Sequence, residues 1–252
     1  MTELLWKNLR APELRALAAL DAIVVVPVGS MEQHGPHLPV QVDALIATEI
    51  AVRAARLVQA DEPVVVAPTV WCGLAEHHMD FGGTITLSFD TFRALLGDIC
   101  RSLVRHGFRR IALHNGHGGN IDALNVIVGD LARELDVPVA TACYPLLADA
   151  AARYKEILEK QSNVRHAGEA ETSMLLALKP ELVDREAIAA IAQDGADAGG
   201  RRSGAYRYRS FAERTQSGVM GYPDAASAEK GELLLDVGAE ALAAALTGDE
   251  LW

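Results

Sequence analysis

The stretch that decides the fold begins with AIVVVPV at residues 22–28 and continues as GSMEQHGPHLPVQVD at residues 29–43. The first seven residues are almost continuously apolar and rich in β-branched side chains, which predicts a buried strand. Gly29 ends this strand, a polar loop follows as far as Asp43, and residues 44–58 have the apolar spacing of a helix. A strand, a polar loop and a helix in this order are typical of an α/β fold.

The same order recurs along the chain. Further strands are predicted at residues 64–67, 110–113 and 137–143, and further helices at residues 90–105 (with Asp90 as N-cap), 121–135, 148–158, 167–179 and 227–246. We therefore predict one three-layer α/β/α domain over residues 1–252, with a mostly parallel sheet. Residues 193–222 are glycine-rich and irregular, and we interpret them as an active-site flap or an oligomer contact.

Bulk composition excludes several classes of protein. The chain has 252 residues, of which 50% are hydrophobic, and a formal net charge of −11, so disorder and binding to nucleic acid or anionic membranes are not expected. Its cysteines, Cys72, Cys100 and Cys143, form neither a disulfide framework nor a CxxC zinc motif. No signal-peptide pattern and no membrane-spanning apolar run are present. These features predict a cytoplasmic protein.

Metal-ligating side chains gather in three short runs. The first holds Glu32, His34 and Asp43, the second His114 and His117, and the third His166, Glu169 and Glu171. Imidazole and carboxylate groups are the ligands that zinc and manganese prefer. The first two runs lie just past the carboxyl end of a predicted strand, where α/β sheets bind ligands. The sequence therefore predicts a buried metal site and a hydrolytic reaction.

Each run also has a simpler interpretation. Asp43 is placed to be a helix N-cap, and the NGHGGN turn at residues 115–120 is an ordinary strand-to-helix connection. Glu169 and Glu171 suit the first turn of a helix through its dipole, and their spacing points them to different sides, so they do not easily share one ion. His166 is suited to act as a general acid or base near neutral pH.

Other polar residues are candidates for substrate contact. Glu76, His77 and His78 form a polar cluster that is either a substrate contact or a solvated loop. The glycine-rich turn lacks the spacing of a dinucleotide fingerprint and of a P-loop, and Ser30 lacks the surroundings of a nucleophile elbow. Nucleotide binding and serine hydrolase chemistry are therefore not indicated.

With these runs in view, the chain resembles the creatininase family of metal-dependent hydrolases over nearly its whole length. The similarity is carried by VVPVGSMEQHGPHLPVQVD at residues 25–43, FGGTITL at 81–87, NGHGGN at 115–120, HAGEAETSMLLAL at 166–178 and SAEKGELLLD at 227–236. The first of these segments is highly specific, whereas NGHGGN alone is only moderately so.

The resemblance implies an α/β fold, ring-like oligomers that are often hexamers, and two divalent ions, either zinc at both sites or zinc with manganese or iron. It implies the ligands Glu32, His34, Asp43, His117 and Glu171. Asp43 would bridge the ions, with His34 and Glu171 on one ion and Glu32 and His117 on the other. His166 would match the acid–base histidine of the family.

Departures from the creatinine hydrolases argue against creatinine as the substrate. Those enzymes carry an aromatic residue and a glutamate after the NGH histidine, where this chain has Gly118 and Gly119. We expect the two glycines to open space, and Trp71, Glu76 and His77 to line it from the opposite loop. Glu169, which those enzymes lack at the matching place, is expected to contact substrate or to replace the missing glutamate.

The sequence thus predicts a homo-oligomeric, di-metal amidohydrolase that cleaves a C–N bond of a small or cyclic amide. Relatives with the NGHGGN motif act on formamide-bearing pyrimidine nucleotides or trim a ribosomally made peptide, so a deformylase or a peptidase is the alternative among enzymes. The alternative from another class is a non-catalytic metal-binding or ligand-binding protein. Five retained ligands favour catalysis over that alternative.

Overall fold

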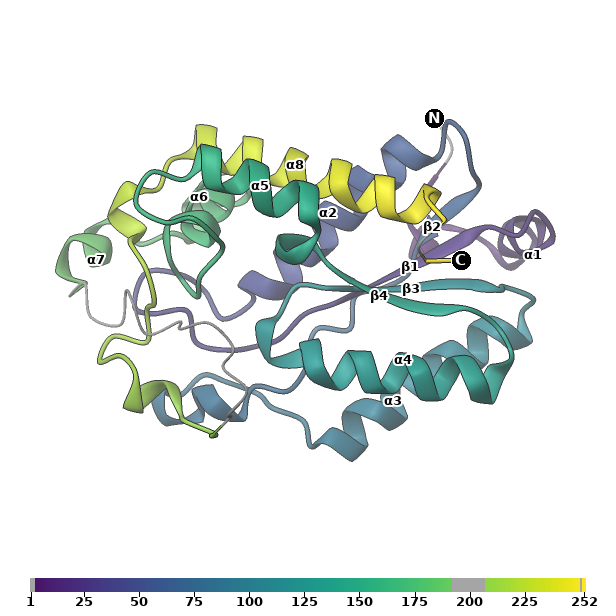
Figure 1. Ribbon diagram of the computed structural model, residues 1–252, viewed down its shortest axis with the longest axis horizontal. Helices are drawn as coiled ribbons and strands as arrows, with labels where there is room; N and C mark the ends of the chain where they lie inside the picture. Colours follow the sequence, from purple (N-terminus) through teal and green to yellow (C-terminus); the bar gives the residue numbers. More distant parts are fainter. Residues whose placement is uncertain (1–2, 192–206, 250) are drawn as a thin grey trace.

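A four-stranded parallel sheet lies at the centre of the computed structural model, which describes residues 3–191, 207–249 and 251–252 (Figure 1). The strands are β1 (Ile23–Val28), β2 (Val64–Val66), β3 (Arg110–Asn115) and β4 (Val139–Cys143), in the order β2-β1-β3-β4. Every pairing in this sheet is parallel. The predicted α/β class with a mostly parallel sheet is confirmed.

Helices cover both faces of the sheet. The α-helices are α1 (Ala11–Ala19), α2 (Val42–Val58), α3 (Phe89–Arg105), α4 (Ile121–Leu135), α5 (Ala148–Ile157), α6 (Glu169–Leu178), α7 (Arg185–Ala190) and α8 (Ala228–Thr247). Short 3-10 helices are η1 (Trp6–Asn8), η2 (Glu76–Phe81), η3 (Gly118–Asn120), η4 (Tyr144–Leu146), η5 (Pro180–Leu182), η6 (Phe211–Glu213) and η7 (Pro223–Ala225). Helices α2, α5, α6 and α8 lie on one side, and α3 and α4 on the other (Figure 1).

Alternation along β1 explains why the layers form. Ile23 and Val25 enter the core shared with α2, α6 and α8, whereas Val24, Val26 and Val28 enter the core shared with α3 and α4. Successive side chains of a strand point to opposite faces, so a strand that is apolar throughout needs cover on both sides. In the described part of the chain, no helix is long and apolar enough to cross a membrane.

The strand order creates a place for a ligand. After β1 the chain crosses to β2 on one side, and after β2 it crosses back to β3 on the other side of β1. The connections after β1 and β3 therefore diverge, and open parallel sheets bind ligands at the carboxyl ends of strands at such a switch point. Val28 and Asn115 are paired at this end of the two strands.

One expectation about the helices is wrong. The N-cap of α3 is Ser88, whose hydroxyl accepts the backbone N–H of Thr91, and Asp90 lies inside the helix. The apolar face of α8 is buried against the chain's own α2 and α6. Of residues 193–222, those at 193–206 lie outside the described residues.

Candidate metal centre

The start of α2 lies between the carboxyl ends of β1 and β3, and this position brings Asp43 to the switch point of the sheet. Asp43 lies in the first turn of α2, which enters between the ends of β1 and β3. A Cβ atom on Gly29 would lie 2.6 Å from the Cα of Ala44, and one on Gly116 would lie 2.7 Å from the carbonyl oxygen of Asp43. The two glycines therefore admit the helix. Gln41 is the N-cap of α2, so the N-cap interpretation of Asp43 is wrong.

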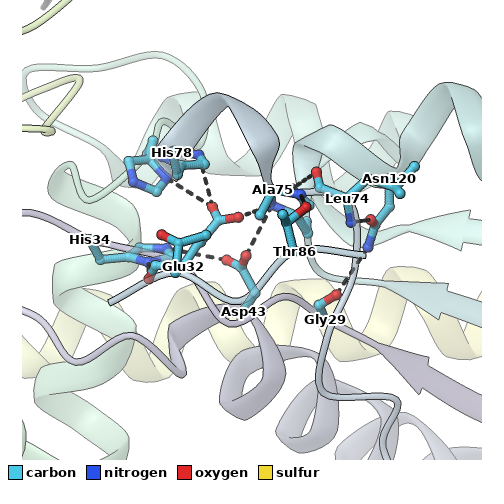
Figure 2. A network of polar contacts seen from close by, with 12 residues as sticks. Gly29, Glu32, His34, Asp43, Leu74, Ala75, His78, Thr86 and Asn120 are labelled. Atoms are coloured by element: carbon cyan, nitrogen blue, oxygen red, sulfur yellow. Dashed lines mark hydrogen bonds and ion pairs between the residues drawn. The ribbon is translucent and has the colours of Figure 1, made fainter. Parts of the chain in front are cut away.

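Asp43 directs its two oxygens to two histidines, and its contact with His34 can be followed in Figure 2. Oδ1 lies 3.2 Å from Nε2 of His34, and Oδ2 lies 3.0 Å from Nδ1 of His117. Possible ligand atoms within 4.8 Å of one another form one group of Glu32, Asp43 and His117 and another of His34, Asp43 and Glu171. The structure therefore brings the five candidate ligands together, in the two groups that the resemblance implies.

Backbone carbonyl groups determine which ring nitrogen of His34 and of His117 carries the proton. Nε2 of His117 donates to the carbonyl oxygen of Leu74 at 3.1 Å, and Nδ1 of His34 donates to the carbonyl oxygen of Glu32 at 3.0 Å. In the neutral ring the other nitrogen then has a free lone pair, and it faces the carboxylates. A lone pair beside a carboxylate is repulsive unless a cation or a proton lies between them. Metal-binding histidines are held in this way.

Several oxygen and nitrogen atoms of the centre are buried without a hydrogen-bond partner, as expected of a site that holds cations. Both carboxylate oxygens of Glu32, Oδ2 of Asp43 and Nε2 of His34 are buried and make no hydrogen bond within the described chain. Burial alone would lower the pKa of His34, but the carboxylates of Asp43 and Glu171 outweigh burial and raise that pKa to about 9. Burial raises the pKa of Glu171 to about 7. Buried charges require partners, so these residues fit divalent cations.

His166 lies at the edge of this centre. Its Nε2 donates to the carbonyl oxygen of Gln33 at 2.7 Å, which turns Nδ1 toward Oε1 of Glu32 at 3.4 Å. Burial, and after it the neighbouring imidazoles of His34 and His78, which oppose a second positive charge beside them, hold the pKa of His166 well below its usual range. Its donor atom also lies within 4.8 Å of those of Glu32 and His34. His166 is thus within reach of both proton transfer and ligation.

A cavity of about 1510 Å³ opens over the centre. Of the predicted substrate contacts, it is lined by Glu76, His77, Gly118 and Gly119. Trp71 is not part of the lining, and its side chain is 48% exposed elsewhere on the surface. The expectation that Trp71 walls the cavity is therefore wrong.

Glu169 also lies away from the cavity. Its carboxylate accepts the backbone N–H groups of Glu159 and Lys160, at 2.8 and 2.9 Å, and the Nζ of Lys230 at 2.8 Å. Its neighbour in the motif, Glu171, points instead toward His34, with 3.6 Å between Oε2 and Nε2. The two glutamates point to different sides, as their spacing predicts. The prediction that Glu169 contacts substrate is wrong, because its carboxylate is occupied by Glu159, Lys160 and Lys230 and does not line the cavity.

The two glycines of the NGHGGN turn differ from each other. A Cβ atom on Gly118 would meet nothing within 4 Å, which agrees with the predicted open space. A Cβ atom on Gly119 would lie 2.6 Å from the carbonyl oxygen of Leu74 and 2.7 Å from the His77 ring. The expectation of open space at Gly119 is therefore wrong, because the hydrogen-bonded pair of the His117 ring and the Leu74 carbonyl packs against Gly119.

Sequence reasoning missed the contact of His78 with Glu32 and the parts that Gln33 and Phe211 play in the site. His78 is 1% exposed and contacts Glu32. Gln33 donates to His78 through its side-chain amide and accepts from His166 through its backbone carbonyl, and Phe211 packs on the rings of both histidines. The sequence signal for His78 was the cluster at residues 76–78, but which of its side chains points inward depends on the geometry of η2. Phe211 carries no sequence signal of this role.

Comparisons with known proteins agree on one family. The creatininase family profile, described as creatinine amidohydrolase, matches residues 7–246. The chain is 34% identical over 222 residues to a mycofactocin precursor peptide peptidase of Mycolicibacterium smegmatis, covering 86% of this chain and 81% of that protein. It is 32% identical over 260 residues to a creatinine amidohydrolase of Pseudomonas putida, covering 97% and 94% of the two chains. A 35% match to the Mycobacterium ulcerans peptidase spans 62% of that protein.

Solved structures support the same assignment. A crystal structure of creatinine amidohydrolase superposes with a TM-score of 0.83 at 29% identity and covers 100% of this chain and 99% of its own. Other similar creatininase structures are described as a manganese form and a Zn-Zn form. The family match, the relatives and the buried histidine–carboxylate cluster lead to one conclusion: the chain belongs to the creatininase family of hydrolases.

Proposed function

We propose that this protein is a di-metal amidohydrolase whose substrate is an amide larger than creatinine. In this proposal Glu32 and His117 hold one ion, His34 and Glu171 hold the other, and Asp43 serves both. The observation that carries the proposal is the position of Asp43, whose two oxygens lie 3.2 and 3.0 Å from lone-pair nitrogens of different histidines. A carboxylate in this position would serve two divalent ions at once.

The chain supplies ligands and a proton carrier for amide hydrolysis. Divalent ions, when bound, would polarise the amide carbonyl and lower the pKa of a water molecule, so that hydroxide is available as the nucleophile near neutral pH. Burial excludes bulk water around Glu32 and Asp43, which are 1% and 3% exposed. His166 is the group placed to pass a proton to the leaving nitrogen, since its Nδ1 faces the centre.

The cavity supports a substrate that is extended and polar. Its volume of about 1510 Å³ exceeds the roughly 300–1,000 Å³ of ordinary small-molecule sites. Its walls carry charges of both signs, including Arg207, Arg209, Arg214, Glu76 and Asp122. A small, flat and weakly polar ring would leave most of these groups unused.

A peptide is the second candidate substrate. The cavity has room for several residues of an extended chain, and the mycobacterial relatives are named as peptidases that act on a precursor peptide. The scissile bond is an amide in either case, so the proposed chemistry is the same.

The test is a side-by-side assay of zinc-loaded and manganese-loaded protein on creatinine, N-formyl compounds and short peptides, with His166→Ala as the inactive control. We expect a kcat/KM for creatinine below roughly 10⁴ M⁻¹s⁻¹, the lower end of ordinary enzymes, and faster turnover of a longer amide. Creatinine turnover at or above that value would refute the substrate proposal. Metal-loaded protein that hydrolyses no amide would favour a non-catalytic binding protein.

A further inference from the structure

His78 is a buried polar side chain that the proposed mechanism leaves unused. It lies in η2 and is 1% exposed, and its Nε2 is 3.1 Å from Oε1 of Glu32 (Figure 2). The contact is not aligned as a linear hydrogen bond, because Oε1 has no such partner among the described residues. It is nevertheless a close approach of a ring nitrogen to a buried carboxylate oxygen, and the electrostatic attraction between such groups is larger in a protein interior than in water.

Gln33 fixes which nitrogen of His78 carries the proton. The backbone N–H of Gly35 donates to Oε1 of Gln33 at 2.8 Å, so the amide oxygen of Gln33 is on that side. Its Nε2 then donates to the carbonyl oxygen of Gly218 at 3.1 Å and to Nδ1 of His78 at 2.8 Å. An amide nitrogen only donates, so Nδ1 accepts and the proton of the neutral ring is on Nε2, toward Glu32.

The other oxygen of Glu32 lies on the opposite side. Oε2 is 3.0 Å from Nδ1 of His117, within the group of Glu32, Asp43 and His117. Glu32 thus lies between a possible ion on its Oε2 side and an N–H group on its Oε1 side. Groups that hold a metal ligand from behind orient it and strengthen its binding.

We propose that His78 is a positioning residue of the centre: it holds Oε1 of Glu32 so that Oε2 faces one ion, and Gln33 keeps the His78 ring in that orientation. The inference rests on the proposed function. The His78 ring also packs 4.3 Å from the ring of His166 and 4.0 Å from that of Phe211, so it has little freedom to turn away.

Two conservative substitutions separate the two nitrogens of His78. The amide nitrogen of glutamine in His78→Gln reaches the place of Nε2 and can still face Glu32. Asparagine in His78→Asn reaches only the place of Nδ1, so it faces Gln33 and removes the contact between residue 78 and Oε1 of Glu32. His78→Ala removes both contacts. The matched control is His106→Asn, because His106 is exposed at the end of α3.

The measurement is zinc and manganese affinity, by competition with a chelator, for each of the two binding steps. We expect His78→Ala and His78→Asn to weaken one step about 10–100-fold, the usual effect of losing a partner behind a ligand. His78→Gln should restore most of that loss. The other step should change little, because the proposed function assigns Glu32 to only one of the two ions, and a general loss of structure would weaken both steps.

Several outcomes would overturn the inference. Unchanged affinity in folded His78→Ala would do so, as would His78→Gln binding as weakly as His78→Ala, or equal loss at both steps. If thermal unfolding shows that His78→Ala is not folded, Gln33→Leu replaces it. Removing the donor to Nδ1 of His78 should weaken the same single binding step. Unchanged affinity in Gln33→Leu would contradict the inference. Wild-type protein that binds no divalent ion would instead refute the proposed function.

Discussion

The His117 side chain shows how one residue of the centre depends on its neighbours. Its Nε2 donates a hydrogen bond to the carbonyl oxygen of Leu74, and Gly119 packs directly against this pair. Gly119→Ala would place a methyl group 2.6 Å from that oxygen, so the ring or the loop must move. We expect this substitution to weaken metal binding about 10–100-fold, as loss of a ligand's supporting contact does.

Gly118→Ala is the matched control for that prediction, because a Cβ atom at Gly118 meets nothing within 4 Å. The measurement is metal content after dialysis against a weak chelator. Equal metal content in the two alanine variants would mean that the packing around His117 does not support the ligand.

His166 poses a separate question at the residue scale, since its position allows proton transfer or ligation. We assign it proton transfer, so His166→Ala should lower kcat by about 10²–10⁴-fold and leave the metal content as in the wild type. Elemental analysis on the same preparation checks this. A variant that had lost an ion would show that His166 is a ligand.

At the scale of elements, the start of α6 is tied to α8. The Glu169 carboxylate joins the loop before α6 to Lys230 of α8, and it is fully buried. We expect Glu169→Ala to lower the free energy of unfolding by about 3 kcal/mol, the cost of removing one partner of a buried pair. Denaturant unfolding checks this, with Glu181→Ala at an exposed position as the control. Unchanged stability with altered substrate preference would restore the substrate-contact interpretation.

The sequence predicted most elements because their signals are local. The apolar run at β1, the helical spacing of α2 and the proline after α6 are each visible within a few residues. The five candidate ligands were found because they follow strands or begin helices, and parallel strands end at one edge of a sheet. The ligand roles themselves came from the family resemblance.

What the sequence could not predict depends on contacts between distant segments. Trp71 and Glu169 were expected at the cavity, but neither lines it. His78 reaches Glu32 only because η2 folds over the end of β1, and Phe211 reaches both His78 and His166 from a segment far along the chain. A local pattern does not say on which side of a loop a side chain will lie.

At the scale of the whole molecule, assembly remains a prediction from the family resemblance, which implies a hexameric ring. Large apolar side chains are exposed along one short segment, namely Met79 at 44%, Ile85 at 50% and Phe89 at 43%. Large exposed apolar side chains are more frequent at interfaces than on the rest of a protein surface when they form one patch, and these three lie within eleven residues of the sequence. We expect Ile85→Asp to give smaller species in sedimentation at micromolar concentration, and Val126→Asp on exposed α4 to leave the assembly unchanged. Monomeric wild-type protein would contradict the prediction.

The central claim is that one carboxylate serves two ions at the switch point of the sheet. The most direct test is elemental analysis of purified wild-type, Asp43→Ala and Glu171→Gln protein. The account predicts two divalent ions per chain in the wild type, loss of most of both in Asp43→Ala, and loss of one in Glu171→Gln. Folded Asp43→Ala protein that retained its full metal content would contradict it.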